Sequence, residues 1–247
     1  NGPILTVRRF PDRPVTMEKL ISLGSLPRQC AEFLAALVKA RYSMIIGGGT
    51  GSGKTTFLGA LSNYIPKDER LITIEDNAEL KIQGVENLVR MEAKMANMEG
   101  ASAITIRDLI RTALRMRPDR IIVGEVRGEE AVDMLQALNT GHEGSLSTAH
   151  ANSARDMLSR LETMTLMGMD LPLEAIRRQI ASGVDILIHL GRLRDKSRKV
   201  LEITEVCGFE NHEICTRTLY QWKDGCGLVK TAELFNREKL NRAGVKI

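Results

Sequence analysis

Residues 47–56 read GGGTGSGKTT, in which five glycines are interspersed with a threonine and a serine and are followed by a lysine and two threonines. Residues 48–55 fit the pattern GxxxxGK(S/T) in full. Glycine allows backbone N–H groups to turn inward around a phosphate with no Cβ in the way. A flexible linker is also rich in glycine, but it needs no Lys-Thr pair between an apolar run (SMII) and a helical pattern (KTTFLGALSNYI). The stretch therefore predicts a phosphate-binding loop.

Each part of this loop has a role if the ligand is ATP with Mg²⁺. Backbone N–H groups and the N-terminus of the following helix present positive charge to the phosphates. Lys54 reaches the β- and γ-phosphates, and the hydroxyl of Thr55 ligates Mg²⁺. The predicted nucleotide-binding residues are Gly48, Gly49, Thr50, Gly51, Ser52, Gly53, Lys54, Thr55 and Thr56.

Apolar runs alternate with helical patterns along most of the 247 residues. Strands are predicted at RLITIED, RIIVGE and GSLSTAH, and helices at ITIRDLIRTALRM, EEAVDMLQALNTG, SARDMLSRLETMTLMG and LPLEAIRRQIASG. The runs DILIHLGRL and KVLEITEV are predicted to pair as a hairpin. This alternation predicts an α/β fold with a mostly parallel sheet flanked by helices. Residues 92–103 carry the least pattern and are predicted to form a loop.

Composition narrows the class of protein. The net charge is only +4, and basic residues are interleaved with acids, which is weak evidence for nucleic-acid binding. The four cysteines contain no C-x-x-C pair, so neither a zinc site nor a disulfide framework is favoured. No apolar run approaches the roughly 20 residues of a membrane span, and no signal peptide is recognised. We expect a protein that is soluble or at most peripheral to a membrane.

Acids follow two of the predicted strands. Glu75 and Asp76 end one strand, and Glu125 ends the run RIIVGE, where Gly124 stands at the position of an expected metal-binding Asp. Ligands in open α/β sheets bind beyond the carboxyl ends of the strands, so both acids should face the phosphate loop. Glu125 could then meet Mg²⁺, directly or through water, or activate water. Solvated turn acids remain an alternative for both.

Two histidines and several arginines are further candidates. His142 and His150 flank the strand GSLSTA, and His150 should share the carboxyl-end crevice, where it could donate to the γ-phosphate. Arg127 follows Glu125 by two residues. Three arginines share one face of a predicted helix, either as a solvated stripe or as contacts to phosphate or a neighbouring subunit: Arg107, Arg111 and Arg115.

Four short motifs, called boxes below, follow one another along the chain: the phosphate loop, the acids Glu75 and Asp76, the pair Gly124-Glu125, and the two histidines. They lie within the stretches GGGTGSGKTT, TIEDNAEL and RMRPDRIIVGEVRGEEAVDMLQALNTGHEGSLSTAHANSARDMLSRLE. Together they resemble the ATPases of type II and type IV secretion systems, and most of all the tight-adherence (Flp-type) pilus assembly ATPases of the TadA/CpaF type. The resemblance covers roughly residues 4–206. Residues 207–247 match only loosely.

The resemblance implies a RecA-like P-loop core that works as a hexameric ring. Residues 48–55 match its Walker A motif, and Glu75 falls in an acidic box whose glutamate is a proposed general base. Gly124 and Glu125 match an atypical Walker B motif in which Gly precedes Glu. His142 and His150 match a histidine box. The residues that we predict to be catalytic are Glu75, Glu125, His150, Lys54 and Arg127, with Thr55 and Glu125 at the metal.

The resulting functional prediction is Mg²⁺-dependent ATP hydrolysis that powers pilus assembly or protein secretion. The motor is expected in the cytoplasm at the inner face of the cell membrane, bound to a pilus or secretion platform protein and not to nucleic acid. Residues 1–14 are predicted to be the remnant of an N-terminal domain, 15–206 the ATPase domain, and 207–247 a small appendage of strand and helix. The alternatives are a nucleotide-dependent switch or scaffold with little turnover, and a nucleic-acid translocase on the same core.

Overall fold

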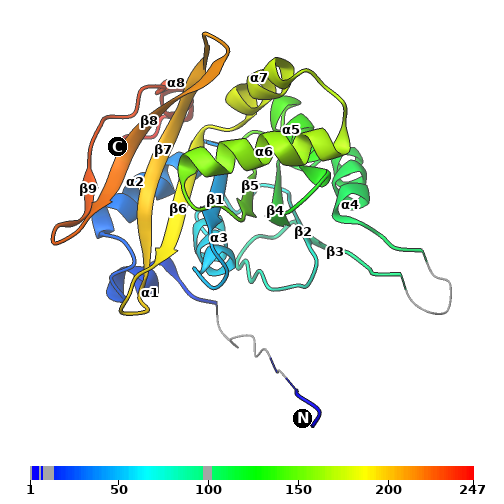
Figure 1. Ribbon diagram of the computed structural model, residues 1–247, viewed down its shortest axis with the longest axis horizontal. Helices are drawn as coiled ribbons and strands as arrows, with labels where there is room; N and C mark the ends of the chain where they lie inside the picture. The colour runs from blue at the N-terminus through cyan, green and yellow to red at the C-terminus, as the bar shows by residue number, and fades with distance from the viewer. Residues whose placement is uncertain (1, 6, 8–13, 97–101) are drawn as a thin grey trace.

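The computed structural model describes residues 2–5, 7, 14–96 and 102–247 (Figure 1). Most of the segment predicted as the remnant of an N-terminal domain, and the middle of the predicted loop at residues 92–103, lie outside the described residues. The described chain forms one sheet with helices on both of its faces (Figure 1).

The sheet contains nine strands among the described residues, in the order β3-β2-β4-β5-β1-β6-β7-β8-β9. The first six strands in this order are parallel, and the β6–β7, β7–β8 and β8–β9 pairs are antiparallel. Their bounds are β1 Met44–Gly48, β2 Leu71–Glu75, β3 Leu88–Glu92, β4 Arg120–Val126, β5 Leu146–Ala149, β6 Ile186–Arg192, β7 Arg198–Glu210, β8 Glu213–Lys223 and β9 Gly227–Lys230.

The helices divide into two layers because successive strand residues face opposite sides of the sheet. Ile46 packs in one apolar cluster with α1, α2, α3 and α8, whereas its neighbour Ile45 packs in a second cluster with α4 to α7. The helices are α1 Met17–Ser22, α2 Arg28–Lys39, α3 Lys54–Ser62, α4 Ile106–Ala113 with a 3₁₀ turn at Leu114–Met116, α5 Glu130–Asn139, α6 Ala154–Gly168, α7 Leu173–Gly183 and α8 Glu238–Ala243.

The predicted α/β fold with a mostly parallel sheet is confirmed, and so is the hairpin, which is formed by β6 and β7. The C-terminal strands are not set apart from this sheet. The proposed boundary after residue 206 falls within β7, and β8 and β9 extend the same sheet.

The C-terminal end of the chain is held against the sheet by two acids, the buried Glu205 and the half-buried Asp185. Both carboxylate oxygens of Glu205 accept backbone N–H groups, from Phe235 at 2.8 Å and from Asn236 at 2.7 Å. Asp185 forms an ion pair of 2.6 Å with Lys239 in α8. These contacts hold the last segment against the core through its backbone as well as its side chains.

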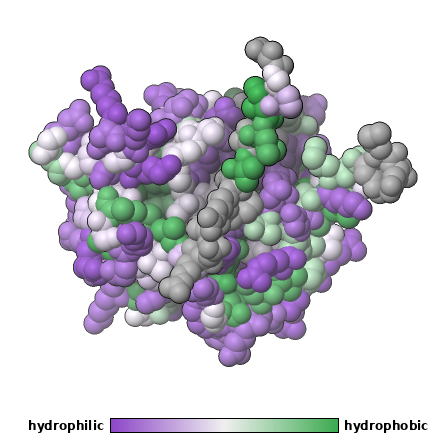
Figure 2. Space-filling view, turned by 90° about the horizontal axis from the view of Figure 1, so that it is seen from below, coloured by the Kyte–Doolittle hydropathy of each residue, from purple (hydrophilic) through white to green (hydrophobic). Residues whose placement is uncertain are grey.

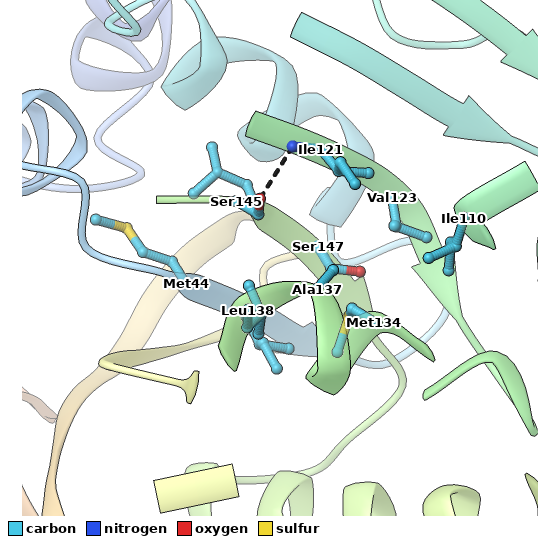
Figure 3. A pocket seen from close by; sticks show the side chains of 11 residues that line it. Met44, Ile110, Ile121, Val123, Met134, Ala137, Leu138, Ser145 and Ser147 are labelled. Carbon is cyan, nitrogen blue, oxygen red and sulfur yellow. Dashed lines mark hydrogen bonds between the residues drawn. The ribbon is translucent and has the colours of Figure 1, made fainter. Parts of the chain in front are cut away.

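A small cavity lies between α5 and the sheet (Figure 3). Its volume is about 10 Å³, near the minimum for one water molecule. Apolar side chains line most of it, and the nearby Ser145 hydroxyl already donates to the carbonyl of His142 and accepts from the N–H of Ile121. We interpret the cavity as a packing defect.

The surface mixes hydrophilic and hydrophobic residues on the face shown in Figure 2. In the part of the chain that the structure describes, no helix has both the length and the apolar character that a membrane span requires.

Candidate nucleotide-binding site

The predicted phosphate loop connects β1 to α3, at the carboxyl end of a central strand. Gly51 and Gly53 have φ values of +73° and +96°, which other residues adopt at a cost. Gly48 has no room for a side chain, because a Cβ would lie 2.6 Å from the carbonyl oxygen of Leu190 and in contact with the hydroxyl of Ser52. Backbone conformation therefore explains Gly51 and Gly53, and close packing explains Gly48.

Lys54 begins α3 and folds back into the loop. Its Nζ donates to the carbonyls of Gly48 at 3.0 Å and Gly49 at 3.3 Å, and it lies 3.6 Å from Oε1 of Glu125. The side chain is 8% exposed, and burial lowers its pKa, although Glu125 acts in the opposite direction. The ammonium group is thus held where phosphates of a nucleotide could exchange for these oxygens.

A β-bulge aims Glu125 at Lys54. Between the pairs Val123–Ser147 and Val126–Ala149, two residues of β4 oppose the single residue Thr148 of β5. Such a bulge redirects the side chains of the strand that carries the extra residue. The Thr148 hydroxyl donates to the carbonyl of Gly124 at 2.7 Å and so fastens the bulge.

The carboxylate of Glu125 contacts three other predicted site residues. Its Oε1 lies 3.0 Å from Nε2 of His150 as well as near Lys54, and its Oε2 accepts from Nε of Arg127 at 2.5 Å. Burial lowers the pKa of His150, so its imidazole is neutral near pH 7. Arg127 also reaches Asp76 at 3.1 Å, which links the ends of β4 and β2.

Glu75 lies beside this cluster with a different set of contacts. Its Oε1 accepts the backbone N–H groups of Glu79 at 3.0 Å and Leu80 at 2.9 Å. Burial raises its pKa, and these two hydrogen bonds oppose the shift. A Cβ on Gly124 would lie 3.0 Å from Cγ of Glu75. The glycine in place of the expected Asp therefore makes space for Glu75.

The remaining candidates are distributed more widely. Thr55 and Thr56 lie in the first turn of α3, half-buried and exposed respectively. His142 precedes β5 at the opposite end from His150, and its Nδ1 lies 3.3 Å from the carbonyl oxygen of Ala137.

Arg107 and Arg111 lie in α4 and bind the chain's own α5, whereas Arg115 lies in the 3₁₀ turn that follows α4. Nε of Arg107 and Nε of Arg111 donate to the two oxygens of the buried Asp133, at 2.7 and 2.8 Å. This pairing favours a structural role for both. Arg115 is exposed.

Sequence reasoning missed two residues that touch the site. Thr148 fastens the bulge, and Arg198, from β7, donates to the carbonyl of Gly51 at 2.8 Å. Thr148 looks like any β-branched residue in a buried strand. Arg198 is 147 positions from its partner, and no local pattern joins them.

Comparison with known proteins places this chain in a family. A family model described as type II/IV secretion system protein matches residues 1–240. The chain is 44% identical over 204 residues to a putative conjugal transfer protein of Mycobacterium tuberculosis, covering 82% of this chain and 57% of the relative. It is 39% identical over 177 residues to the type IV secretion system protein PtlH of Bordetella pertussis, covering 70% of this chain and 52% of that protein.

Solved structures agree with the fold. The crystal structure of the VirB11 ATPase from the Brucella suis type IV secretion system, in complex with sulphate, matches with a TM-score of 0.64 and 36% identity over 75% of this chain and 54% of that one. The pilus retraction motor PilT with bound ADP matches with a TM-score of 0.59 and 24% identity over 96% of this chain and 57% of that one. These matches confirm the predicted RecA-like core.

The chain spans little more than half the length of these relatives. Nevertheless, the family model covers almost all of it, and the boxes of the site lie within that match. This chain belongs to the type II/IV secretion system protein family.

Proposed function

We propose that this chain is the motor part of an ATPase that powers pilus assembly or protein secretion through Mg²⁺-dependent ATP hydrolysis. The observation that carries the proposal is the cluster around Glu125, which lies 3.6 Å from Nζ of Lys54 and 3.0 Å from Nε2 of His150. It stands next to a complete phosphate loop. Relatives named as secretion and conjugal transfer proteins support the class of process.

The phosphate loop binds the nucleotide through its backbone N–H groups and Lys54. In the structure, Lys54 donates to two loop carbonyls. The β- and γ-phosphates are stronger acceptors because they carry charge, so Lys54 exchanges the carbonyls for phosphate oxygens.

The donor set fits Mg²⁺. The Thr55 hydroxyl, in the first turn of α3, and the Glu125 carboxylate, at the end of β4, are the hard oxygen ligands that this ion prefers. When bound, Mg²⁺ neutralises charge on the phosphates. Thr55 and Glu125 are the residues that would hold it.

Water activation falls to a carboxylate at the same edge of the sheet, with Glu125 the leading candidate and Glu75 the second. Glu125 has side-chain partners that a nucleotide can displace, whereas one oxygen of Glu75 is already occupied by two backbone N–H groups. Neutral His150 donates from Nε2 and reports on the γ-phosphate by shifting its hydrogen bond away from Glu125. Arg127 holds the other oxygen of Glu125 and keeps the carboxylate oriented.

The wider assembly is also a proposal. The protein acts as a homo-oligomeric ring, most simply a hexamer, at the cytoplasmic face of the inner membrane against a pilus or secretion platform protein. Within the family we place it with the tight-adherence pilus assembly ATPases. Support comes from the likeness of the quoted sequence stretches to those ATPases.

Hydrolysis and binding, measured separately, test the proposal. Lys54→Ala should abolish nucleotide binding and turnover. Glu125→Gln should bind ATP but hydrolyse it at least about 100-fold more slowly, because it removes a general base or a metal ligand. Matched controls are Lys39→Ala on the exposed face of α2 and Glu86→Gln in an exposed turn, which should retain the parent rate.

Two results would redirect the assignment. Parent-rate hydrolysis by both site variants contradicts the proposed site. ATP binding by the parent protein with turnover no faster than that of Glu125→Gln instead favours the nucleotide-dependent switch.

A further inference from the structure

The phosphate loop is held from outside by the β6–β7 hairpin. Nε of Arg198, the first residue of β7, donates to the carbonyl of Gly51 at 2.8 Å. The stem of Arg198 also crosses the loop, since a Cβ on Gly53 would lie 3.3 Å from its Cδ. Arg198 therefore contacts the loop at two of its glycines.

The peptide between Gly51 and Ser52 needs such a contact. Gly51 is exposed, has a φ of +73° and would have no atom within 4 Å of an added Cβ, so local packing does little to fix it. The N–H of Ser52 donates to the carbonyl of Gly49 at 3.2 Å. With the carbonyl of Gly51 bound by Arg198, both ends of this peptide are engaged and its orientation is set.

The hairpin itself is well anchored. Arg198 pairs with Arg192 across β6 and β7. The next two residues bind the turn between α1 and α2: Nζ of Lys199 donates to the carbonyl of Gly24 at 2.6 Å, and the N–H of Val200 donates to the carbonyl of Ser25 at 2.9 Å. Arg198 thus extends from a fixed strand toward a loop that is rich in glycine.

We propose that Arg198 is a positioning residue that holds the nucleotide-free phosphate loop in the shape that accepts phosphates. A loop carbonyl turned toward the nucleotide would repel its phosphates, and Arg198 keeps the carbonyl of Gly51 on the hairpin side. Preorganisation of this kind lowers the cost of binding and leaves the chemical step alone. The inference rests on the proposed binding of nucleotide by residues 48–56.

The test compares Arg198→Ala with Arg194→Ala, which removes the same charge from an exposed site on the same hairpin. Loss of one net hydrogen bond corresponds to roughly 3- to 10-fold in an equilibrium constant. We therefore expect Arg198→Ala to weaken ADP binding and raise KM for ATP by about that factor, with kcat within about two-fold of the parent. Arg198→Lys should recover part of the affinity. Amide hydrogen exchange at residues 49–53 of the empty protein should accelerate in Arg198→Ala only.

Two outcomes overturn the inference. Equal weakening by Arg194→Ala assigns the effect to the general charge of the hairpin, and a fall in kcat with unchanged affinity assigns Arg198 to the chemical step. The variant Lys54→Ala distinguishes failure of the positioning role of Arg198 from failure of the proposed nucleotide site. If Lys54→Ala binds ADP as the parent does, the loop is not the nucleotide site. If Lys54→Ala loses binding while Arg198→Ala matches its control, only the positioning role is lost.

Discussion

At the scale of single residues, Glu125 connects most of the candidate site. Its Oε1 is shared by Lys54 and His150, while its Oε2 is held by Arg127. A nucleotide brings phosphate oxygens that compete with Oε1 for the same donors. Under the proposed function, nucleotide binding would release one oxygen of Glu125 while Arg127 retains the other. In the structure, the contacts with Lys54, His150 and Arg127 hold the carboxylate of Glu125 in place.

The orientation of Glu125 depends on the hydroxyl of Thr148. Thr148→Val keeps the shape of this buried side chain but leaves the carbonyl of Gly124 without its 2.7 Å donor. We expect kcat to fall about 10-fold or more, as when a small displacement misaligns a reacting group, while KM for ATP changes little. Steady-state kinetics of ATP hydrolysis measure both.

Thr148→Ser is the matched control, because it keeps the hydroxyl and loses the methyl. It should retain most of the parent kcat. If the serine and valine variants lose activity equally, packing of the methyl and not the hydrogen bond positions the bulge.

The residues of the site differ in how far sequence predicts them. Lys54 belongs to a contiguous motif. Glu125 lies at the end of β4 and His150 follows β5, so a rule about parallel sheets brings them to one edge. The bulge cannot be foreseen, because it arises from the register between β4 and β5. The contact of Arg198 arises from a hairpin that is far away in the chain. The sequence motif therefore predicts the residues that would do the chemistry. The groups that orient these residues depend on pairing between strands that are far apart in the chain.

At the scale of elements, Arg120 joins β4 to α2 and to the segments that precede β2 and β5. It starts β4 and is fully buried, and it forms a two-pronged ion pair with Glu69 at 2.6 and 2.8 Å. Its Nη1 also donates to the carbonyl of Val38 in α2 at 2.6 Å and to the carbonyl of Gly144 before β5 at 3.3 Å. One guanidinium thus satisfies groups from separate parts of the fold.

Glu69→Ala should therefore destabilise the protein by about 3 kcal/mol, because it strands a buried charge. Chemical denaturation followed by circular dichroism measures the free energy of unfolding. Glu18→Ala is the matched control, since Glu18 makes a similar two-pronged pair with Arg28 but in solvent. It should leave stability nearly unchanged. Equal losses from the two variants would contradict the view that burial decides the value of the pair.

The elements that sequence misses share a physical cause. The strands β2, β4 and β5 are buried on both faces and so show continuous apolar runs, which are easy to recognise. In contrast, β3 lies at the edge of the sheet, is half-exposed and reads LVRME, so its pattern is weak. The short helix α1 has only six residues, too few for a clear period. The sequence predicts only a small strand and helix for residues 207–247. It does not predict that β8 and β9 extend the common sheet, because long-range pairing fixes their place.

At the scale of the whole molecule, residues 207–247 share a core with the ATPase fold. Leu234 and Leu240 are buried in the same apolar cluster as α2 and α3. Glu205, which is 1% exposed, binds the backbone before α8 through both oxygens. A segment fastened in this way should unfold together with the sheet.

Glu205→Ala tests this coupling, because it leaves two backbone N–H groups without their acceptor. We expect a loss of about 2 kcal/mol, or roughly 4–8 °C in Tm for a chain of this length. Calorimetry should still show one transition, and deletion of residues 231–247 should lower its Tm further. Glu213→Gln, an exposed acid on β8, is the control and should leave the Tm unchanged. If the C-terminal residues formed a separable appendage, the transition of the ATPase core would keep the parent Tm in both altered proteins, and a second, smaller transition would carry the loss.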